Sequence, residues 1–141
     1  MTEAYATDVE LARILENPLV ELQPRLADDR GFIQPLVERT MQSASLIVCT
    51  KGAVRANHYH KTDWHYCYVL SGQMEYYHRQ TGSTEPPTRF TVGPGQMVFT
   101  PPLVDHAMVF AEDTTFLVLS RNPRDQKAYE ADVVRIDLVK A

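Results

Sequence analysis

The pattern of apolar and polar residues along this chain predicts strands over most of its length. Short runs rich in Val, Ile, Tyr, Phe and Thr recur between turns that contain Gly or Pro, as is typical of a sandwich or barrel. The predicted strands cover residues 20–22, 32–37, 45–50, 66–70, 73–79, 89–92, 96–100, 104–110, 115–120 and 133–139. Because only Ser71 and Gly72 separate two of them, we expect the strands at 66–70 and 73–79 to pair with each other.

Only the N-terminal segment has the periodicity of a helix. Residues 7–10 (Thr-Asp-Val-Glu) fit a capping box, and Leu11, Ile14 and Leu15 then mark one apolar face. Asn17-Pro18 ends this pattern. The sequence therefore predicts an all-β fold, a barrel or jelly roll with one short N-terminal helix.

The 141 residues suffice for one core, so we expect a single domain. It would comprise a helix and arm at 1–40, a barrel core at 41–121 and a last strand within 122–141. The net charge of −4 and the lack of a basic cluster argue against binding to nucleic acid or to a membrane surface. The first eight residues contain no apolar run, so we expect a cytoplasmic protein in which Cys49 and Cys67 are reduced.

Four histidines are the strongest candidates for chemistry. His58 and His60 are two residues apart, so both rings leave one face of a strand. His65 follows a short turn, and His106 lies in another strand-like run. Imidazoles on facing strands are suitable ligands for a divalent transition metal, and we expect one such ion, Mn, Fe, Ni or Zn.

At these residues the sequence resembles the cupin superfamily. The first cupin motif, G-x5-H-x-H-x4-E-x6-G, is matched by Gly52, His58, His60 and Gly72, with His65 at its glutamate position. The second motif, G-x5-P-x-G-x2-H-x3-N, is matched at three positions: Gly95, Pro101 and His106. Leu103 and Phe110 replace its second glycine and its asparagine. The resemblance implies a cupin jelly-roll barrel with His58, His60, His65 and His106 as metal ligands.

His65 is the position at which this chain departs from the cupin pattern. It is either a fourth ligand or a proton carrier, and we retain both roles. Four neutral imidazoles leave a divalent site at 2+, whereas three imidazoles and one carboxylate leave 1+. A unit charge about 4 Å away is worth roughly 4 kcal/mol at an effective dielectric constant near 20. The site is therefore expected to favour an anionic ligand or a developing enolate.

Two further segments resemble sugar enzymes. The segment D-x-R-G-F at residues 28–32 is similar to one in the dTDP-4-dehydrorhamnose 3,5-epimerases, and residues 55–59 (Arg-Ala-Asn-His-Tyr) look like their R-G-x-H-Y segment. A nearer likeness is to metal-binding cupin domains of surface-polysaccharide sugar enzymes, which share the form R-G-N-H-Y-H. This resemblance implies that Arg30 and Arg55 hold the anionic part of a small-molecule substrate such as a nucleotide-sugar.

Other pocket residues follow from strand phase. Met108 and Phe110 share the face of His106, so we expect them to form an apolar wall for the substrate. Cys67 shares the strand face of His65. Several tyrosines are candidate proton donors, and of these Tyr76 is the one we assign to catalysis.

The resulting hypothesis is a metal-binding cupin with isomerase or epimerase activity on a keto-sugar or similar small carbonyl compound. A metal-dependent dioxygenase is the alternative enzyme, and a non-catalytic binding module is the third possibility, because fold does not decide among them. We also expect a homodimer, since the sheet edges need covering and the N-terminal strand with Pro35 is suited to a partner's barrel.

Overall fold

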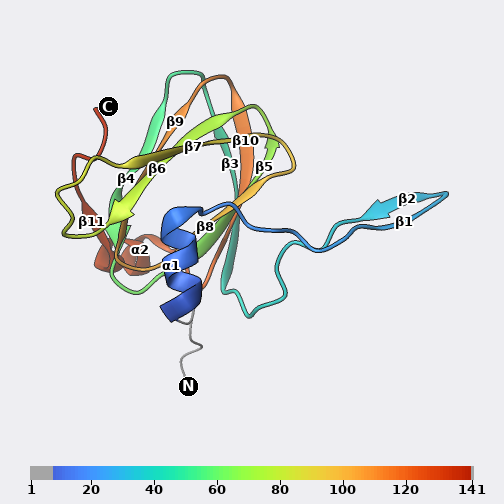
Figure 1. Cartoon of the computed structure of the whole chain (residues 1–141), viewed down its shortest axis with the longest axis horizontal. Coiled ribbons are helices and arrows are strands. Elements are labelled where there is room, and N and C mark those ends of the chain that lie inside the picture. Colours follow the sequence, from blue (N-terminus) through green and yellow to red (C-terminus); the bar gives the residue numbers. More distant parts are fainter. Residues whose placement is uncertain (1–7, 141) are drawn as a thin grey trace.

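Two antiparallel sheets face each other in a computed structural model that describes residues 8–140, with side chains from residue 12 onward (Figure 1). The elements are α1 (Asp8–Glu16), β1 (Leu26–Asp28), β2 (Gly31–Ile33), β3 (Ser43–Cys49), β4 (Val54–His60), β5 (His65–Ser71), β6 (Met74–Gln80), β7 (Thr88–Val92), β8 (Met97–Thr100), β9 (Val104–Phe110), β10 (Thr114–Ser120), α2 (Gln126–Asp132) and β11 (Val133–Arg135). The sheet orders are β3-β10-β5-β8 and β11-β4-β9-β6-β7. The predicted all-β jelly roll with an N-terminal helix is confirmed.

Strict alternation along the strands builds the core between the sheets. In β10 every second residue is buried, including Phe116 and Val118. Because successive side chains of a strand point to opposite faces, one set fills the barrel and the other covers its outside. The register pairs His58 with His106, and Phe110 with Met74 farther along β9. Histidines therefore occupy one end of the barrel, and an apolar cluster fills the other.

The expected pairing of the strands at 66–70 and 73–79 is wrong. β5 belongs to the four-stranded sheet, whereas β6 pairs with β7 and β9 in the other sheet. The chain crosses between the sheets at Gly72, whose φ is 90°. A Cβ there would overlap the backbone of Asp113 and Thr114, so the crossing requires glycine.

The N-terminal helix is present as α1, whereas the two strands predicted after it do not form as expected. The capping box at residues 7–10 lies outside the part of the chain whose side chains are described. Near residues 20–22 the chain only bridges to β8: Leu19 pairs with Val98, and the N–H of Val20 donates to the carbonyl of Met97 at 2.8 Å. In place of the strand at 32–37, β1 and β2 form a short hairpin that projects from the barrel (Figure 1). Proline at Pro35 removes a backbone donor and ends the pairing.

The C-terminal segment also differs from its predicted form. Instead of a turn and one strand at 133–139, the chain forms α2 and then only the three residues of β11. The carboxylate of Asp125 accepts a hydrogen bond from the N–H of Ala128, which starts α2 as an N-cap. No helix within residues 8–140 has the length and apolar character needed to cross a membrane. Cys49 and Cys67 are buried and unpaired, as predicted for reduced thiols.

Candidate functional site

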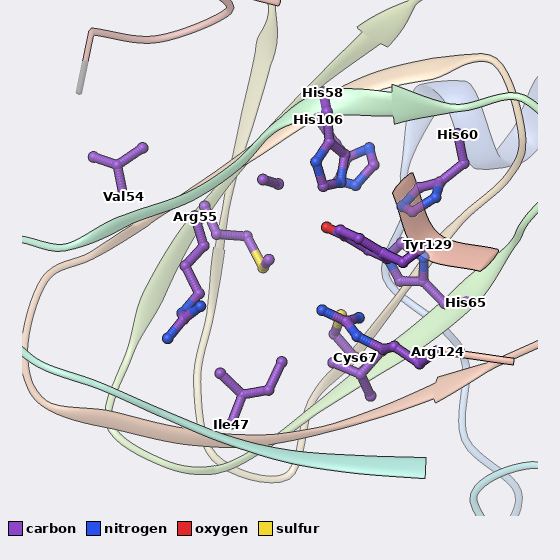
Figure 2. A pocket seen from close by; sticks show the side chains of 13 residues that line it. Ile47, Val54, Arg55, His58, His60, His65, Cys67, His106, Arg124 and Tyr129 are labelled. Carbon is purple, nitrogen blue, oxygen red and sulfur yellow. The ribbon is translucent and has the colours of Figure 1, made fainter. Parts of the chain in front are cut away.

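The four predicted histidines come together at one end of the barrel (Figure 2). β4 supplies His58 and His60, β5 supplies His65, and β9 supplies His106. The ring centroids of His58 lie 4.7 Å from those of both His60 and His106. His65 lies 5.3 Å from both His60 and His106 by the same measure. We call these four residues the histidine cluster.

A bulge in β4 controls which side chains share the face of the histidine cluster. Ala56 and Asn57 both have positive φ, 67° and 57°, and the register with β9 shifts between Ala56 and His58. One extra residue in the strand brings Arg55 into phase with His58. Arg55 accordingly stands opposite Met108, just as His58 stands opposite His106.

Hydrogen bonds define the tautomers of two members of the cluster. The Nδ1 atom of His106 lies 3.0 Å from the carbonyl oxygen of Val104, and that of His60 lies 3.1 Å from a carboxylate oxygen of Asp132. Carbonyl and carboxylate oxygens only accept, so Nδ1 carries the proton in both rings. Nε2 of each neutral ring is then left with a free lone pair.

Burial keeps the cluster neutral. Desolvation lowers the pKa of His58 to about 3, and repulsion from His60 when that ring is protonated, and from Arg124 and Arg135, adds to that effect. Burial likewise lowers the pKa of His65 and His106 well below the usual value. For His60 burial also lowers the pKa, with Asp132 acting in the opposite direction. At neutral pH the cluster therefore presents neutral imidazoles, which is the form that binds metal.

The geometry of the cluster fits a transition metal. Potential ligand atoms of His58, His60 and His106 all lie within 4.8 Å of one another, and a second group with this property comprises His60, Asp63 and His65. Metal–nitrogen distances are about 2.1 Å, so a small inward movement of the three rings would complete the coordination. A carboxylate or carbonyl that holds the distal N–H of a histidine is typical of such sites.

A cavity of about 200 Å³ opens beside the cluster. Besides the four histidines it is lined by Ile47, Val54, Arg55, Ala56, Cys67, Met108, Val118, Arg124 and Tyr129. The structure thus brings the predicted residues Arg55, Met108 and Cys67 to the cluster. Burial raises the pKa of the Cys67 thiol to about 12, so this side chain is a neutral part of the wall.

Three predicted residues do not line this cavity. Tyr76 is buried in the core, its hydroxyl lies 2.7 Å from that of Thr100, and burial raises its pKa, so the structure does not bring it to the cavity. Phe110 stacks on Phe116 at the apolar end of the barrel instead of forming a pocket wall. Arg30 lies on the projecting hairpin, where it pairs with Asp28 and is 85% exposed, away from the cavity of its own chain.

Sequence analysis missed three residues, all contributed by α2 and the loop before it. Arg124 and Tyr129 line the cavity, with the guanidinium carbon of Arg124 4.8 Å from the ring centroid of Tyr129. Asp132 ends α2 and bonds to His60. The signal that could have found them is Asp125 as an N-cap before the helix-favouring residues 126–131.

Comparison with solved structures shows the same fold in sugar 3,4-ketoisomerases and in a capsular polysaccharide assembling protein. QdtA, a sugar 3,4-ketoisomerase from Thermoanaerobacterium thermosaccharolyticum in complex with TDP, is 21% identical, with a TM-score of 0.67 over 84% of this chain and 87% of that chain. A 3,4-ketoisomerase from Helicobacter canadensis is 18% identical, with a TM-score of 0.65 over 79% and 85% of the two chains. The capsular polysaccharide assembling protein CapF from Staphylococcus aureus is 19% identical, with a TM-score of 0.62 over 83% of this chain but only 32% of its own.

Sequence comparisons identify the family. A search of curated proteins gives no significant match. The profile described as "Cupin domain" matches residues 45–120, which is more than half of the chain and contains all four histidines of the cluster. The chain therefore belongs to the cupin domain family.

Proposed function

We propose that this protein is a metal-dependent isomerase or epimerase that acts on a keto-sugar or a similar small carbonyl compound. The observation that carries the proposal is the pair of oriented rings, His60 and His106, each with Nδ1 held by an acceptor and Nε2 free. The sugar 3,4-ketoisomerases that share the fold supply the reason to test a keto-sugar first.

His58, His60 and His106 would hold a divalent transition metal, with His65 as a fourth ligand or as a proton carrier. When bound, such an ion polarises a carbonyl group and stabilises the negative charge that develops on enolisation. The neutral His65 ring, in its role as proton carrier, accepts the proton from the carbon next to the carbonyl.

Tyr129 takes the role that sequence analysis assigned to Tyr76. Its ring centroid lies 6.1 Å from that of His58, and its hydroxyl points into the cavity (Figure 2). Burial raises the pKa of this phenol, so it stays protonated at neutral pH and can donate a hydrogen bond to a substrate oxygen. Met108, Ile47 and Val54 contribute the apolar wall.

Metal content and proton exchange test this function together. Protein purified without a histidine tag should contain close to one transition-metal ion per chain, and His60→Ala should lose most of it. Incubation with 4-keto-sugars in deuterium oxide under nitrogen should give deuterium incorporation that His60→Ala abolishes. Protein that neither contains nor takes up Mn, Fe, Ni or Zn contradicts the proposal. Oxygen uptake with the iron form, without deuterium exchange, would instead favour a dioxygenase.

A further inference from the structure

The charge of the cavity wall is opposite to that of the whole protein. The chain carries a net charge of −4, yet none of the described residues that line the cavity is Asp or Glu, and two are arginines. Asp132 is not one of the lining residues, because it lies on the Nδ1 side of His60. A cavity with this lining attracts anions, and a divalent ion at the histidine cluster would increase the attraction.

Arg55 is held in the cavity by the bulge and by a neighbouring thiol. Its position opposite Met108 places it on the face of the histidine cluster. Its Nε atom lies 2.9 Å from the Sγ atom of the buried Cys49. No carboxylate of residues 12–140 pairs with Arg55, so the other two nitrogens of its guanidinium group remain available to a ligand.

Arg124 reaches the same cavity from the other side, from the loop before α2 (Figure 2). The ring of Tyr129 supports its guanidinium group at 4.8 Å. Among the side chains described, Arg124 also has no carboxylate partner. Two guanidinium groups without acidic partners among the described residues thus line the same cavity as the histidine cluster.

We propose that Arg55 and Arg124 together bind a carboxylate of the substrate, so that the ligand is a small sugar acid whose carbonyl end faces the histidine cluster. The position of the carbonyl rests on the proposed function, whereas the anion site rests on the two arginines alone. Guanidinium groups match a carboxylate because their paired N–H donors fit its two oxygens.

The size of the cavity favours a sugar acid over a complete nucleotide-sugar. At about 200 Å³ it is smaller than the roughly 300–1,000 Å³ of pockets that bury drug-sized ligands. A hexose derivative is small enough to be largely enclosed, whereas most of a nucleoside diphosphate would lie outside.

A matched pair of ligands tests this assignment. Glucuronate and glucose share the sugar ring and differ mainly in a carboxylate, and both can be titrated by calorimetry into the protein as purified. We expect wild-type protein to bind glucuronate at least tenfold more tightly than glucose. Loss of one charged hydrogen-bonding group should reduce the affinity for glucuronate by about 10- to 100-fold in Arg124→Gln and in Arg55→Gln. Arg121→Gln removes a charge from the same loop but from outside the cavity, and should retain the preference.

Four results would overturn the assignment. Equal affinity of wild-type protein for the two sugars, or binding of neither at millimolar concentration, would show that the arginines hold no carboxylate. A preference that survives in both arginine variants would place the anion elsewhere. Binding of TDP more tightly than glucuronate, lost in the same variants, would assign the arginines to a diphosphate. A failure of the proposed function is distinguishable, because it would abolish deuterium exchange and leave the glucuronate preference unchanged.

Discussion

Asp132 accepts a hydrogen bond from Nδ1 of His60 at 3.1 Å and links the end of α2 to the histidine cluster. The same carboxylate also accepts the N–H and hydroxyl of Thr62 and the N–H of Asp63. Burial raises the pKa of Asp132, but these hydrogen bonds outweigh burial and leave its pKa below the usual value. An ionised, fully bonded Asp132 therefore fixes both the orientation and the tautomer of His60.

Replacing Asp132 should weaken metal binding without removing a metal ligand. In Asp132→Asn the acceptor loses its charge, and we expect metal affinity to fall by about 10- to 100-fold. Competition with a fluorescent chelator measures this change. The control is Glu130→Gln, because Glu130 lies on the same helix but bonds to the exposed Arg135. Unchanged metal affinity in Asp132→Asn would show that the contact only connects α2 to the loop at residues 62–63.

His65→Glu separates the two roles of His65. If His65 is a ligand, the variant should keep the metal, because carboxylate oxygens coordinate at about 2.0–2.2 Å and imidazole nitrogens at about 2.0–2.1 Å. The site would lose one unit of positive charge, and azide affinity should fall by up to a few kcal/mol, less after solvent screening. If His65 is a free base, azide affinity should stay nearly constant and the pH–rate profile should move toward the pKa of a carboxylate. Azide titration of both proteins, with metal content measured in parallel, decides between the roles.

The metal-free protein should lose stability as the pH falls from about 6.5 to 4. Burial lowers the pKa of His58 to about 3 and of His78 to about 4, whereas an unfolded histidine titrates near 6.5. The unfolded chain therefore binds more protons in this range, and the free energy of unfolding decreases as the pH is lowered. Asp63 acts in the opposite direction, because burial raises its pKa to about 6, but it is one group against five histidines.

Urea denaturation of chelator-treated protein at several pH values measures this dependence. His78→Leu removes a buried imidazole outside the histidine cluster and should reduce proton uptake on unfolding by about one. Taking up one proton fewer on unfolding lowers the slope of the free energy of unfolding against pH by about 1.4 kcal/mol per pH unit. Stability that is constant between pH 6.5 and 4.5 would contradict the assignment of neutral, buried histidines.

The homodimer expected from the sequence also has a candidate surface. The outer face of the four-stranded sheet exposes Leu46 and Val48 of β3 and Leu70 of β5. The projecting hairpin exposes Leu26, Phe32 and Ile33, and an isolated hairpin is at best marginally stable in water. We expect light scattering to report a dimer at micromolar concentration and Leu46→Asp to shift it toward monomer. Leu103→Asp, which changes an exposed leucine in a loop, should remain dimeric. A wild-type protein that is monomeric at micromolar concentration would contradict this prediction.

The histidine cluster could be predicted because its members follow strand periodicity and motif spacing. The phase of β4 places His58 and His60 on one face, and β9 brings His106 opposite His58. The strand phase and the motif spacing that predict these histidines can be read without knowing which strands become neighbours, although the placement of His106 opposite His58 comes from the pairing of β4 with β9. The pairing of strands cannot be read from such local patterns. The hairpin predicted across Gly72 was wrong because a turn residue alone does not reveal whether the chain reverses or crosses to another sheet.

Arg124, Tyr129 and Asp132 could not be predicted in the same way. They reach the cavity because α2 packs over one end of the barrel, which is a tertiary arrangement without a spacing signature. Tyr76 is the converse case, a predicted residue that the structure does not bring to the cavity. Its strand phase is inward, but its side chain is fully buried and its hydroxyl lies against that of Thr100, so strand phase alone does not place a residue in the cavity wall.

The extra residue in β4 divides that strand into two halves. Odd-numbered residues face the cavity in the first half, and even-numbered residues face it in the second. Even-numbered residues face inward after Asn57, at His58 and His60, whereas odd-numbered Arg55 faces inward before it. Under the proposed function, the residue expected to bind the ligand and the residues expected to bind the metal can therefore vary independently along one strand. The bulge is stabilised by a residue far away in the sequence, because the side-chain amide of Asn57 bonds to both the N–H and the carbonyl of Val139. Val139, remote from the cavity in sequence, thus helps to hold the bulge between Arg55 and His58 in place.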